Sequence, residues 1–253
     1  MPKIISVHSF RGGTGKSNIT ANLAATVARY GYRVGIIDTD IQSPGIHVVF
    51  GFDEETMDRS LNDYLWGRCD IEDTAYDVTS ALKDAARKGS AIYLIPSSLN
   101  LGEITRVLRE GYDVGLLHDG FQELIDRLNL EYLFIDTHPG LNEETLLSIT
   151  ISDALIIILR PDRQDFQGTA VTVDVARQLE VPELLLVVNK VLDNLDLKAL
   201  QQQVELAYNA SVAGILPLSE DVVQLASSDI FCLRFPKHPF SQVVEAIAKQ
   251  IIG

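Results

Sequence analysis

The sequence predicts an α/β fold with a doubly wound, mainly parallel sheet flanked by helices. Short apolar segments such as ALIIIL and LLLVVN alternate with longer stretches of helical periodicity, which is the order of successive βαβ units. Several of these short segments are apolar throughout, as strands of a parallel sheet covered on both faces are. No internal repeat, low-complexity tract or Pro/Gly-rich linker interrupts the sequence. Residues 1–253 are therefore predicted to form one domain.

The predicted elements follow one another in a regular order. Strands are expected at 3–8, 33–38, 91–96, 131–136, 153–159, 184–189 and 212–216. Apolar residues recur with the spacing of one helix face at 16–30, 114–128, 165–179, 196–207 and 238–251, where we expect helices. The stretch 51–90 is acidic and irregular, with MDRSLNDYLW as its clearest helix. We expect it to be an excursion on the surface.

Composition limits the classes of function. The chain is 46% hydrophobic and 22% charged, which is ordinary for a globular protein. It has no apolar run of the ~18–20 residues that a membrane span needs, and no signal-peptide pattern at its start. Its two cysteines, Cys69 and Cys232, are far apart, as is usual in the reduced cytoplasm, so we expect a cytoplasmic protein. The net charge of −14 argues against sequence-independent binding to DNA or anionic lipid.

A glycine-rich loop joins the first predicted strand to the first predicted helix. Glycines let backbone N–H groups point inward as an anion nest, and the following helix adds its N-terminal dipole. In a P-loop, the lysine reaches the β- and γ-phosphates and the next hydroxyl ligates Mg²⁺. The loop therefore predicts a Mg²⁺–nucleotide site whose residues are Gly12, Gly13, Thr14, Gly15, Lys16, Ser17 and Asn18.

Carboxylates follow two further predicted strands. Asp38 and Asp40 lie at and just after the end of strand 33–38, and Asp136 ends strand 131–136. The carboxyl ends of parallel strands share an edge with the phosphate loop, so these side chains are expected beside it. The simpler alternative for Asp38 and Asp40 is that they cap a turn.

With these motifs, the chain resembles the MinD/ParA family of ATPases, which also includes the nitrogenase iron protein and arsenite-pump ATPases. That family has a deviant P-loop, K-G-G-x-G-K-S/T. The general motif would put a glycine at position 10, where this chain has Phe10, and Arg11 stands where the family has its signature lysine. The matches run in order from residue 3 to about residue 252, so the resemblance covers almost the whole chain.

The resemblance implies a role for each carboxylate. Asp40 matches the aspartate of switch I (38–45), which positions the attacking water, and Asp38 would order Mg²⁺-bound water and the loop. Asp136 and Gly140 match the D-x-x-x-G of switch II (136–142), which holds Mg²⁺ through water and senses the γ-phosphate through the glycine N–H. The implied metal site therefore combines the three aspartates with Ser17.

Switch II also departs from the commonest family sequence, D-S-P-A-G, because His138 and Pro139 follow Asp136 and Thr137. His138 could act as a general base. We favour a role for His138 in packing or hydrogen bonding within the switch, because phosphoryl transfer needs mainly positioning and charge stabilisation.

Two residues near the ends of predicted strands resemble the family's base-binding residues. Asn189 resembles the asparagine of the family's N-K/R pair, and a carboxamide can read the adenine amino edge with one donor and one acceptor. The GTPase motif N-K-x-D would need an aspartate at position 192, which is Leu192. Pro217 matches the family's last loop and would pack near adenine. The combination favours ATP over GTP.

The position of Arg11 leads us to expect a dimer. In the family, the signature lysine crosses the interface of an ATP-sandwich dimer to the partner's nucleotide. An arginine keeps that charge and adds a planar fork of donors suited to phosphate. An ATP-dependent homodimer with Arg11 acting in trans is therefore implied, and a structural ion pair within one subunit is the alternative. Phe10 is expected to pack under the loop or at the dimer face.

The chain end distinguishes among members of the family. The segment HPFSQVVEAIAKQIIG contains one lysine and has the pattern of a core-packing helix, not of the basic membrane-targeting helix of MinD. We therefore expect a slow Mg²⁺-dependent ATPase switch, with Lys16, Asp40 and Arg11 in catalysis and a protein as regulator or cargo. The alternatives are an ATP-dependent biosynthetic or cofactor- or metallocentre-maturation enzyme on the same fold, and a scaffold that binds nucleotide without hydrolysis.

Overall fold

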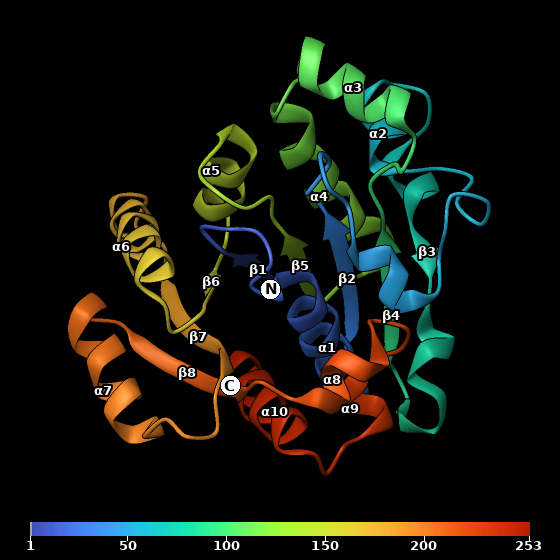
Figure 1. Cartoon of the computed structure of the whole chain (residues 1–253). Coiled ribbons are helices and arrows are strands. Elements are labelled where there is room, and N and C mark those ends of the chain that lie inside the picture. The colour runs from blue at the N-terminus through green and yellow to red at the C-terminus, as the bar shows by residue number, and fades with distance from the viewer. Residues whose placement is uncertain (1) are drawn as a thin grey trace.

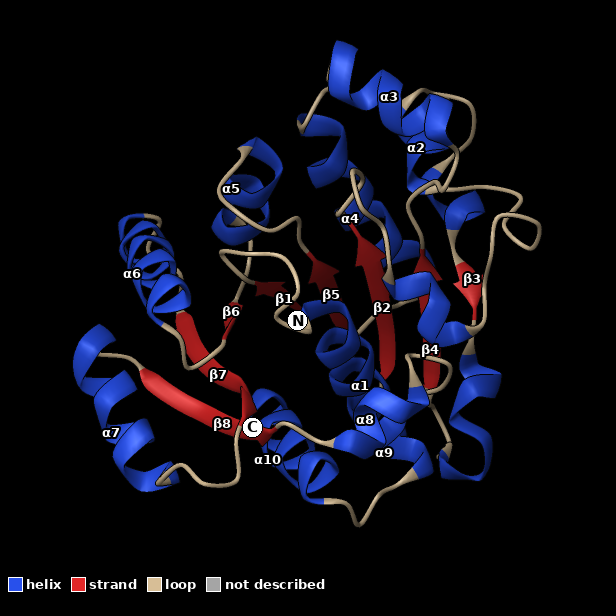
Figure 2. Ribbon diagram, viewed as in Figure 1, coloured by secondary structure: helices blue, strands red, loops and turns tan. Residues whose placement is uncertain are grey.

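The computed structural model describes residues 2–253, in which an eight-stranded sheet lies between two layers of helices (Figures 1 and 2). The strand order is β3-β4-β2-β5-β1-β6-β7-β8. The pairs from β4 through to β8 are all parallel, and β3 is antiparallel to β4. Because β1 lies between β5 and β6, the chain winds outward from the centre of the sheet in both directions. The predicted fold class is confirmed.

The seven predicted strands are confirmed to within two residues at each end. They are β1 (Lys3–His8), β2 (Arg33–Asp38), β4 (Ala91–Ile95), β5 (Tyr132–Asp136), β6 (Ala154–Leu159), β7 (Glu183–Val191) and β8 (Ser211–Pro217). The eighth strand, β3 (Tyr76–Asp77), was not predicted. Its two residues are too few to show the period-two alternation by which a strand is recognised in sequence.

The five predicted helices are also present, as α1 (Lys16–Arg29), α4 (Gly115–Leu128), α6 (Arg163–Gln178), α7 (Leu197–Tyr208) and α10 (Pro239–Ile252). The sequence analysis missed α3 (Leu101–Glu110), α5 (Glu143–Thr150), α8 (Glu220–Leu225) and α9 (Phe231–Arg234). A usable signal existed for α3 and α5, because each begins after an asparagine whose side chain accepts from backbone N–H groups of the first turn. These four helices are short, so their apolar residues repeat over few turns and the helical period is hard to recognise in the sequence.

Two helix layers bury opposite faces of the sheet. Along β1, Ile5 and Val7 belong to the core beneath α1, α9 and α10, whereas Ile4 belongs to the core beneath α2 and α4. A third cluster fills the space between β6, β7 and helices α6 and α7. Burial on both faces explains why these strands are apolar throughout.

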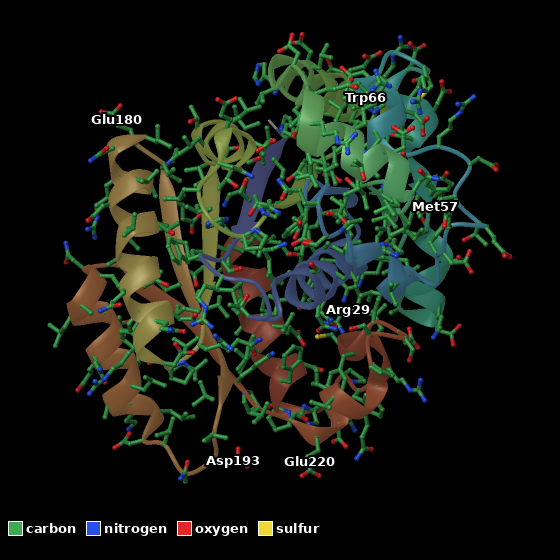
Figure 3. The ribbon with its side chains drawn as sticks, turned by 45° about the horizontal axis from the view of Figure 1, so that its top comes forward. Arg29, Met57, Trp66, Glu180, Asp193 and Glu220 are labelled. Atoms are coloured by element: carbon green, nitrogen blue, oxygen red, sulfur yellow. The ribbon has the colours of Figure 1, made fainter. Side chains whose placement is uncertain are left out.

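The segment 51–90 corrects one expectation. It is irregular, with α2 (Leu61–Leu65) and short 3₁₀ turns η2 (Ile71–Thr74) and η3 (Thr79–Ala85). It is nevertheless anchored, because Leu61, Ile71 and Leu82 are fully or almost fully buried and β3 extends the sheet edge. Figure 3 labels Met57 and Trp66 on this side of the molecule. Buried side chains in each short turn hold the segment.

The C-terminal helix α10 packs on the core as its sequence pattern predicted. Its side chains Phe240, Val244, Ile247 and Ile251 are buried in the cluster that also contains α1. Within residues 2–253, helices long and apolar enough to cross a membrane are absent.

Phe10 fixes the start of the glycine-rich loop against α6. A Cβ atom placed on Gly168, in the first half of α6, would lie 2.0 Å from Phe10 Cδ1. The aromatic ring therefore lies directly on the helix backbone, and only glycine at position 168 leaves room for it. This packing explains why the loop can carry Phe10 where the general P-loop motif has glycine.

We predict that Gly168→Ala lowers the free energy of unfolding by about 1–3 kcal/mol, because Phe10 must move to admit the methyl group. Helix propensity alone predicts the opposite sign, a gain of about 1 kcal/mol. Urea unfolding measures the difference, with Gln167→Ala on the exposed side of the same helix as the control. A stabilised Gly168→Ala protein would show that Phe10 does not press on α6.

Candidate nucleotide-binding site

The carboxyl ends of the three central strands bring the predicted site residues into one place. In the sheet register, Asp38 of β2 lies opposite Asp136 of β5, and Val7 of β1 lies opposite the same Asp136. The glycine-rich loop follows β1 directly and leads into α1 (Figure 1). Residues far apart in sequence therefore meet at this edge of the sheet.

The loop encloses a polar cavity of about 310 Å³. Gly13 and Gly15 have φ of 77° and 94°, a left-handed backbone that favours glycine. Helix α1 begins at Lys16 without a side-chain cap, so its first N–H groups are available to an anion. The cavity is lined by the predicted loop residues Gly12, Gly13, Thr14, Gly15, Lys16, Ser17 and Asn18, together with Ser9, Asp40, Ser43, Pro139 and Ser227.

Lys16 lines the cavity and forms a buried ion pair with Asp136, which does not itself line it. Lys16 Nζ lies 2.8 Å from Asp136 Oδ1 and 3.9 Å from Asp40 Oδ2, and the Lys16 side chain is only 6% exposed. Thr20 of α1 donates its hydroxyl to the same Asp136 Oδ1 at 3.1 Å. The second oxygen, Asp136 Oδ2, is buried and has no hydrogen-bond partner.

These groups fit a magnesium ion held by Ser17 and by water. Mg²⁺ keeps several waters and takes few protein ligands beside the phosphates, so a free carboxylate oxygen at Asp136 and a hydroxyl at Ser17 are suitable donors. Across residues 2–253, His, Cys, Asp and Glu side chains form no cluster of three or more that could hold a metal by itself. The free oxygen of Asp136 and the Ser17 hydroxyl suit a cation that arrives with phosphate.

Asp38 is fully buried and holds its own segment together. Its Oδ1 accepts from the Asp40 N–H at 2.9 Å, and its Oδ2 accepts from the Gly45 N–H at 3.3 Å. Burial, together with the nearby charge of Asp136, raises the pKa of this carboxyl well above its usual value, and Lys16 offsets only part of the rise. Asp38 does not line the cavity, and both of these hydrogen bonds lie within residues 38–45. Its role in ordering Mg²⁺-bound water and the loop stays a prediction.

Asp40 faces the cavity and is bound from both switches. Its Oδ1 accepts from His138 Nδ1 at 2.7 Å and from the Ser43 hydroxyl at 2.8 Å. Burial raises the pKa of the Asp40 carboxyl, but the His138 bond, the Lys16 charge and the Ser43 bond outweigh it, so the pKa lies below its usual value. Asp40 is therefore ionised at neutral pH. Sequence reasoning missed Ser43, although a serine three residues after an aspartate is a common turn partner.

Switch II touches the loop through its backbone. The Gly140 N–H, expected at the γ-phosphate, donates to the Ser9 carbonyl at 3.2 Å, with Gly140 at φ 87°. A Cβ atom on Gly12 would lie 4.0 Å from Pro139 Cγ. The two segments are thus neighbours, and the Gly140 N–H can reach a phosphate only by leaving Ser9.

A second cavity, of about 200 Å³ and mainly apolar, continues from the first. The two share Gly15, Asn18 and Ser227 in their linings. The second is lined further by Ile19, Asn189, Lys190, Pro217, Leu218, Ser219, Val222, Val223, Ala226 and Phe240. Its apolar lining is of the kind that accepts a nucleotide base, and Asn189 and Pro217 both lie in it. Their contact with adenine stays a prediction.

Asn189 also supports the loop, a role that the sequence analysis missed. Its Nδ2 donates to the Thr14 carbonyl at 2.7 Å, and the neighbouring Lys190 Nζ donates to the Gly13 carbonyl at 2.8 Å. A Cβ atom on Gly15 would lie 2.6 Å from Asn189 Nδ2. The N-K pair after β7 therefore holds the loop from behind, while Asn189 lines the base cavity.

Arg11 is paired within its own subunit. Its Nη1 lies 2.6 Å from Gln164 Oε1, 3.3 Å from Asp165 Oδ1 and 3.6 Å from Asp162 Oδ1, all at the start of α6. Asp165 also binds Arg160. In the single chain, Arg11 makes the intramolecular pair that the sequence analysis gave as the alternative.

Comparison with known proteins gives the class first. A family model described as an AAA domain matches residues 2–183, which is more than half of the chain. The chain belongs to this family of ATP-binding P-loop proteins.

Individual proteins agree with this assignment. The chain is 27% identical to an uncharacterized ATP-binding protein of Methanocaldococcus jannaschii, over 98% of this chain and 87% of that protein. It is 27% identical to an iron–sulfur cluster carrier protein of Pyrococcus horikoshii, over 73% of this chain and 60% of the relative. The septum site-determining protein MinD of Pyrococcus horikoshii, solved with Mg-ADP, has a TM-score of 0.80 at 19% identity, covering 99% of this chain and 96% of that one. The MinD/ParA fold is confirmed.

His8, the last residue of β1, is a fully buried histidine next to this site. Its Nδ1 lies 2.8 Å from the Thr137 hydroxyl, and its Nε2 is buried without a partner. Burial, followed by the charges of Lys16 and His138, lowers the pKa of His8 to about 3. The folded protein therefore holds His8 neutral across the range in which the unfolded chain protonates it.

We predict that His8 makes the protein lose stability in mild acid. The unfolded chain takes up a proton below its pKa of about 6.5, whereas the folded chain does so only near 3. The free energy of unfolding should thus fall by about 2 kcal/mol between pH 7 and pH 5 from this group alone. Urea unfolding at both pH values should show that His8→Asn loses less than wild type. Equal losses would place the pKa of His8 near its ordinary value.

Proposed function

We propose that this protein is a Mg²⁺-dependent ATP-binding and ATP-hydrolysing switch of the MinD/ParA type, which dimerises with ATP and positions or regulates a protein partner. One observation carries the proposal: Lys16, which is paired with the buried Asp136, lines a glycine-rich cavity that adjoins an apolar one. A polar pocket for phosphates and an adjoining apolar pocket for a base match the two ends of a nucleotide.

The chemistry follows from how these groups would meet a triphosphate. The loop N–H groups and the start of α1 bind phosphate oxygens, and Lys16 exchanges Asp136 for the β- and γ-phosphates. Bound Mg²⁺, held by Ser17 and through water by Asp136, would neutralise charge on the phosphates. Asp40, ionised and on the cavity wall, orients the attacking water. Because Asp40 is asked mainly to orient water, and the described side chains that line the cavity include no strongly tuned base, we expect slow turnover.

We predict that the protein binds Mg·ATP more tightly than Mg·GTP, because Leu192 stands where an aspartate would read guanine. Isothermal titration should show the preference, and Lys16→Ala should abolish the affinity that depends on the phosphates. Since Lys16→Ala leaves Asp136 buried without its partner, at a cost of about 3–5 kcal/mol, folding is checked by circular dichroism.

The matched control for that titration is Lys198→Ala, an exposed lysine of α7, which should bind ATP as wild type does. Binding of GTP that equals or exceeds that of ATP would refute the adenine assignment, and ATP binding by folded Lys16→Ala would refute the phosphate site.

The proposed dimer follows from where the charges lie. The loop mouth and both switch segments share one edge of the sheet, so that two copies can form a self-complementary face. ATP adds negative charge to that face in each subunit, and a cation delivered across the axis offsets the repulsion. Arg11 stands at this mouth. Its carboxylate partners are Asp165, which is buried, and Asp162, which is partly exposed.

We predict that Asp40→Ala, which should retain ATP without turnover, is dimeric with ATP and monomeric with ADP in light scattering. Adding Arg11→Ala should weaken the ATP-bound dimer while the monomer still binds ATP, and Arg11→Lys should restore part of it. The control is Arg163→Ala, an exposed arginine beside the Arg11 partners. An intact ATP-bound dimer with Arg11→Ala would make Arg11 a structural residue of its own subunit.

A cofactor- or metallocentre-maturation role is the second candidate, supported by the likeness to an iron–sulfur cluster carrier. The two cysteines argue against it. Cys232 is 3% exposed, and burial raises the pKa of its thiol to about 12, so it is unsuited to act as a thiolate ligand. Cys69 lies on the 51–90 segment, outside the linings of both cavities. The switch is therefore the better supported proposal.

A further inference from the structure

We propose that His138 is a positioning residue for hydrolysis, which fixes the Asp40 carboxylate and links switch II to switch I. The inference rests on the proposed ATP hydrolysis. His138 belongs to switch II, and its Nδ1 lies 2.7 Å from Oδ1 of Asp40 in switch I. The side chain is partly buried, so this bond is made away from bulk water.

The direction of this hydrogen bond is set by chemistry. A carboxylate only accepts, and Asp40 Oδ1 already accepts from the Ser43 hydroxyl and N–H. The short contact with His138 Nδ1 therefore places the proton on this nitrogen, which donates. His138 thus holds Asp40 by a charge-assisted bond, which is stronger than a bond between neutral groups.

The bond decides which oxygen of Asp40 faces the nucleotide. Oδ1 also accepts from the hydroxyl and the backbone N–H of Ser43, at 2.8 Å and 3.3 Å. With three donors, Oδ1 is fully engaged. Oδ2 is the oxygen 3.9 Å from Lys16 Nζ, the side chain that reaches for the phosphates. The carboxylate plane is fixed and one oxygen is left to orient water, as efficient positioning requires.

Ser43 and His138 have different consequences, although both bind the same oxygen. Ser43 lies in the same switch segment as Asp40, so it can only brace that segment locally. His138 comes from the other switch, two residues before Gly140. A movement of Gly140 from Ser9 toward a phosphate would therefore carry His138, and through it Asp40. The side chain joins the two switches at the place where water must be oriented.

The backbone of His138 is restrained on both sides. The following Pro139 disfavours helical conformations for His138. Its carbonyl also accepts from the Thr145 hydroxyl of α5 at 3.3 Å. The imidazole is thus presented to Asp40 from a stiffened backbone, and a misplacement of about 1 Å at such a position can cost about 10²-fold in rate.

The test compares His138→Ala with His138→Asn in single-turnover hydrolysis and in Mg·ATP binding. Asparagine can place its Nδ2 donor near the position of the imidazole Nδ1. His138→Ala should lose about 10- to 100-fold in rate with ATP affinity changed less than about twofold, and His138→Asn should recover much of the rate. His118→Ala, an exposed histidine on α4, is the control and should equal wild type.

A second readout does not depend on activity. Nitrogen-15 NMR of the histidine side chains should show the proton of His138 on Nδ1 in wild type, and this signature should disappear in Asp40→Ala. A proton on Nε2 alone in wild type would overturn the inference.

The kinetic outcomes separate the two proposals. Wild-type rates for His138→Ala, or a His138→Asn protein as slow as His138→Ala, overturn the positioning role and leave the ATPase intact. A wild-type protein that binds ATP but never hydrolyses it overturns the proposed hydrolysis, and the role of His138 in it falls too.

Discussion

The buried pair of Lys16 and Asp136 is the interaction on which the site depends. Buried charges are retained only when they are paired, so this contact fixes the start of α1 against the end of β5. It also leaves an imbalance, since Lys16 faces Asp38 and Asp40 as well. Burial first, and then the charge of Asp136, raises the pKa of Asp38, and Lys16 offsets only part of that rise. A divalent cation entering with phosphates would offset it, which is why the arrangement suits a site completed by its ligand.

The glycine-rich loop owes its shape to contacts from three other parts of the fold. Phe10 lies on α6 at Gly168, and Asn189 after β7 holds the Thr14 carbonyl. Switch II binds the loop entrance through the Gly140 N–H. Loop carbonyls and the preceding carbonyl of Ser9 are thus occupied by protein groups, whereas the N–H groups at the start of α1 have no side-chain cap. Because the carbonyls are occupied and the N–H groups are not, the loop presents donors to its cavity, as an anion site requires.

Arg11 connects the loop to α6 through Gln164 and Asp162, which are accessible to water, and through Asp165, which is buried and also pairs with Arg160. An exposed ion pair contributes about 0–1 kcal/mol, and Asp165 keeps Arg160 as a partner if Arg11 leaves, so the pairing within one subunit presents a limited barrier to a competing phosphate. The contacts with Gln164 and Asp165 are therefore compatible with a cation that changes partner when two copies meet. Phe10 keeps the loop entrance in place during such an exchange, because its own packing does not involve the guanidinium.

Local sequence patterns were enough to predict the fold class, the seven longer strands and the glycine-rich loop, because each depends on local periodicity or on a contiguous motif. How separate segments meet became visible only in the folded chain. It showed that Asn189 holds the loop, that His138 binds Asp40, and that Phe10 packs on Gly168. The segment 51–90 is anchored by isolated buried side chains, a pattern without a period to read. Such contacts join residues tens to more than a hundred positions apart, and their geometry is set only when the sheet brings the strand ends together.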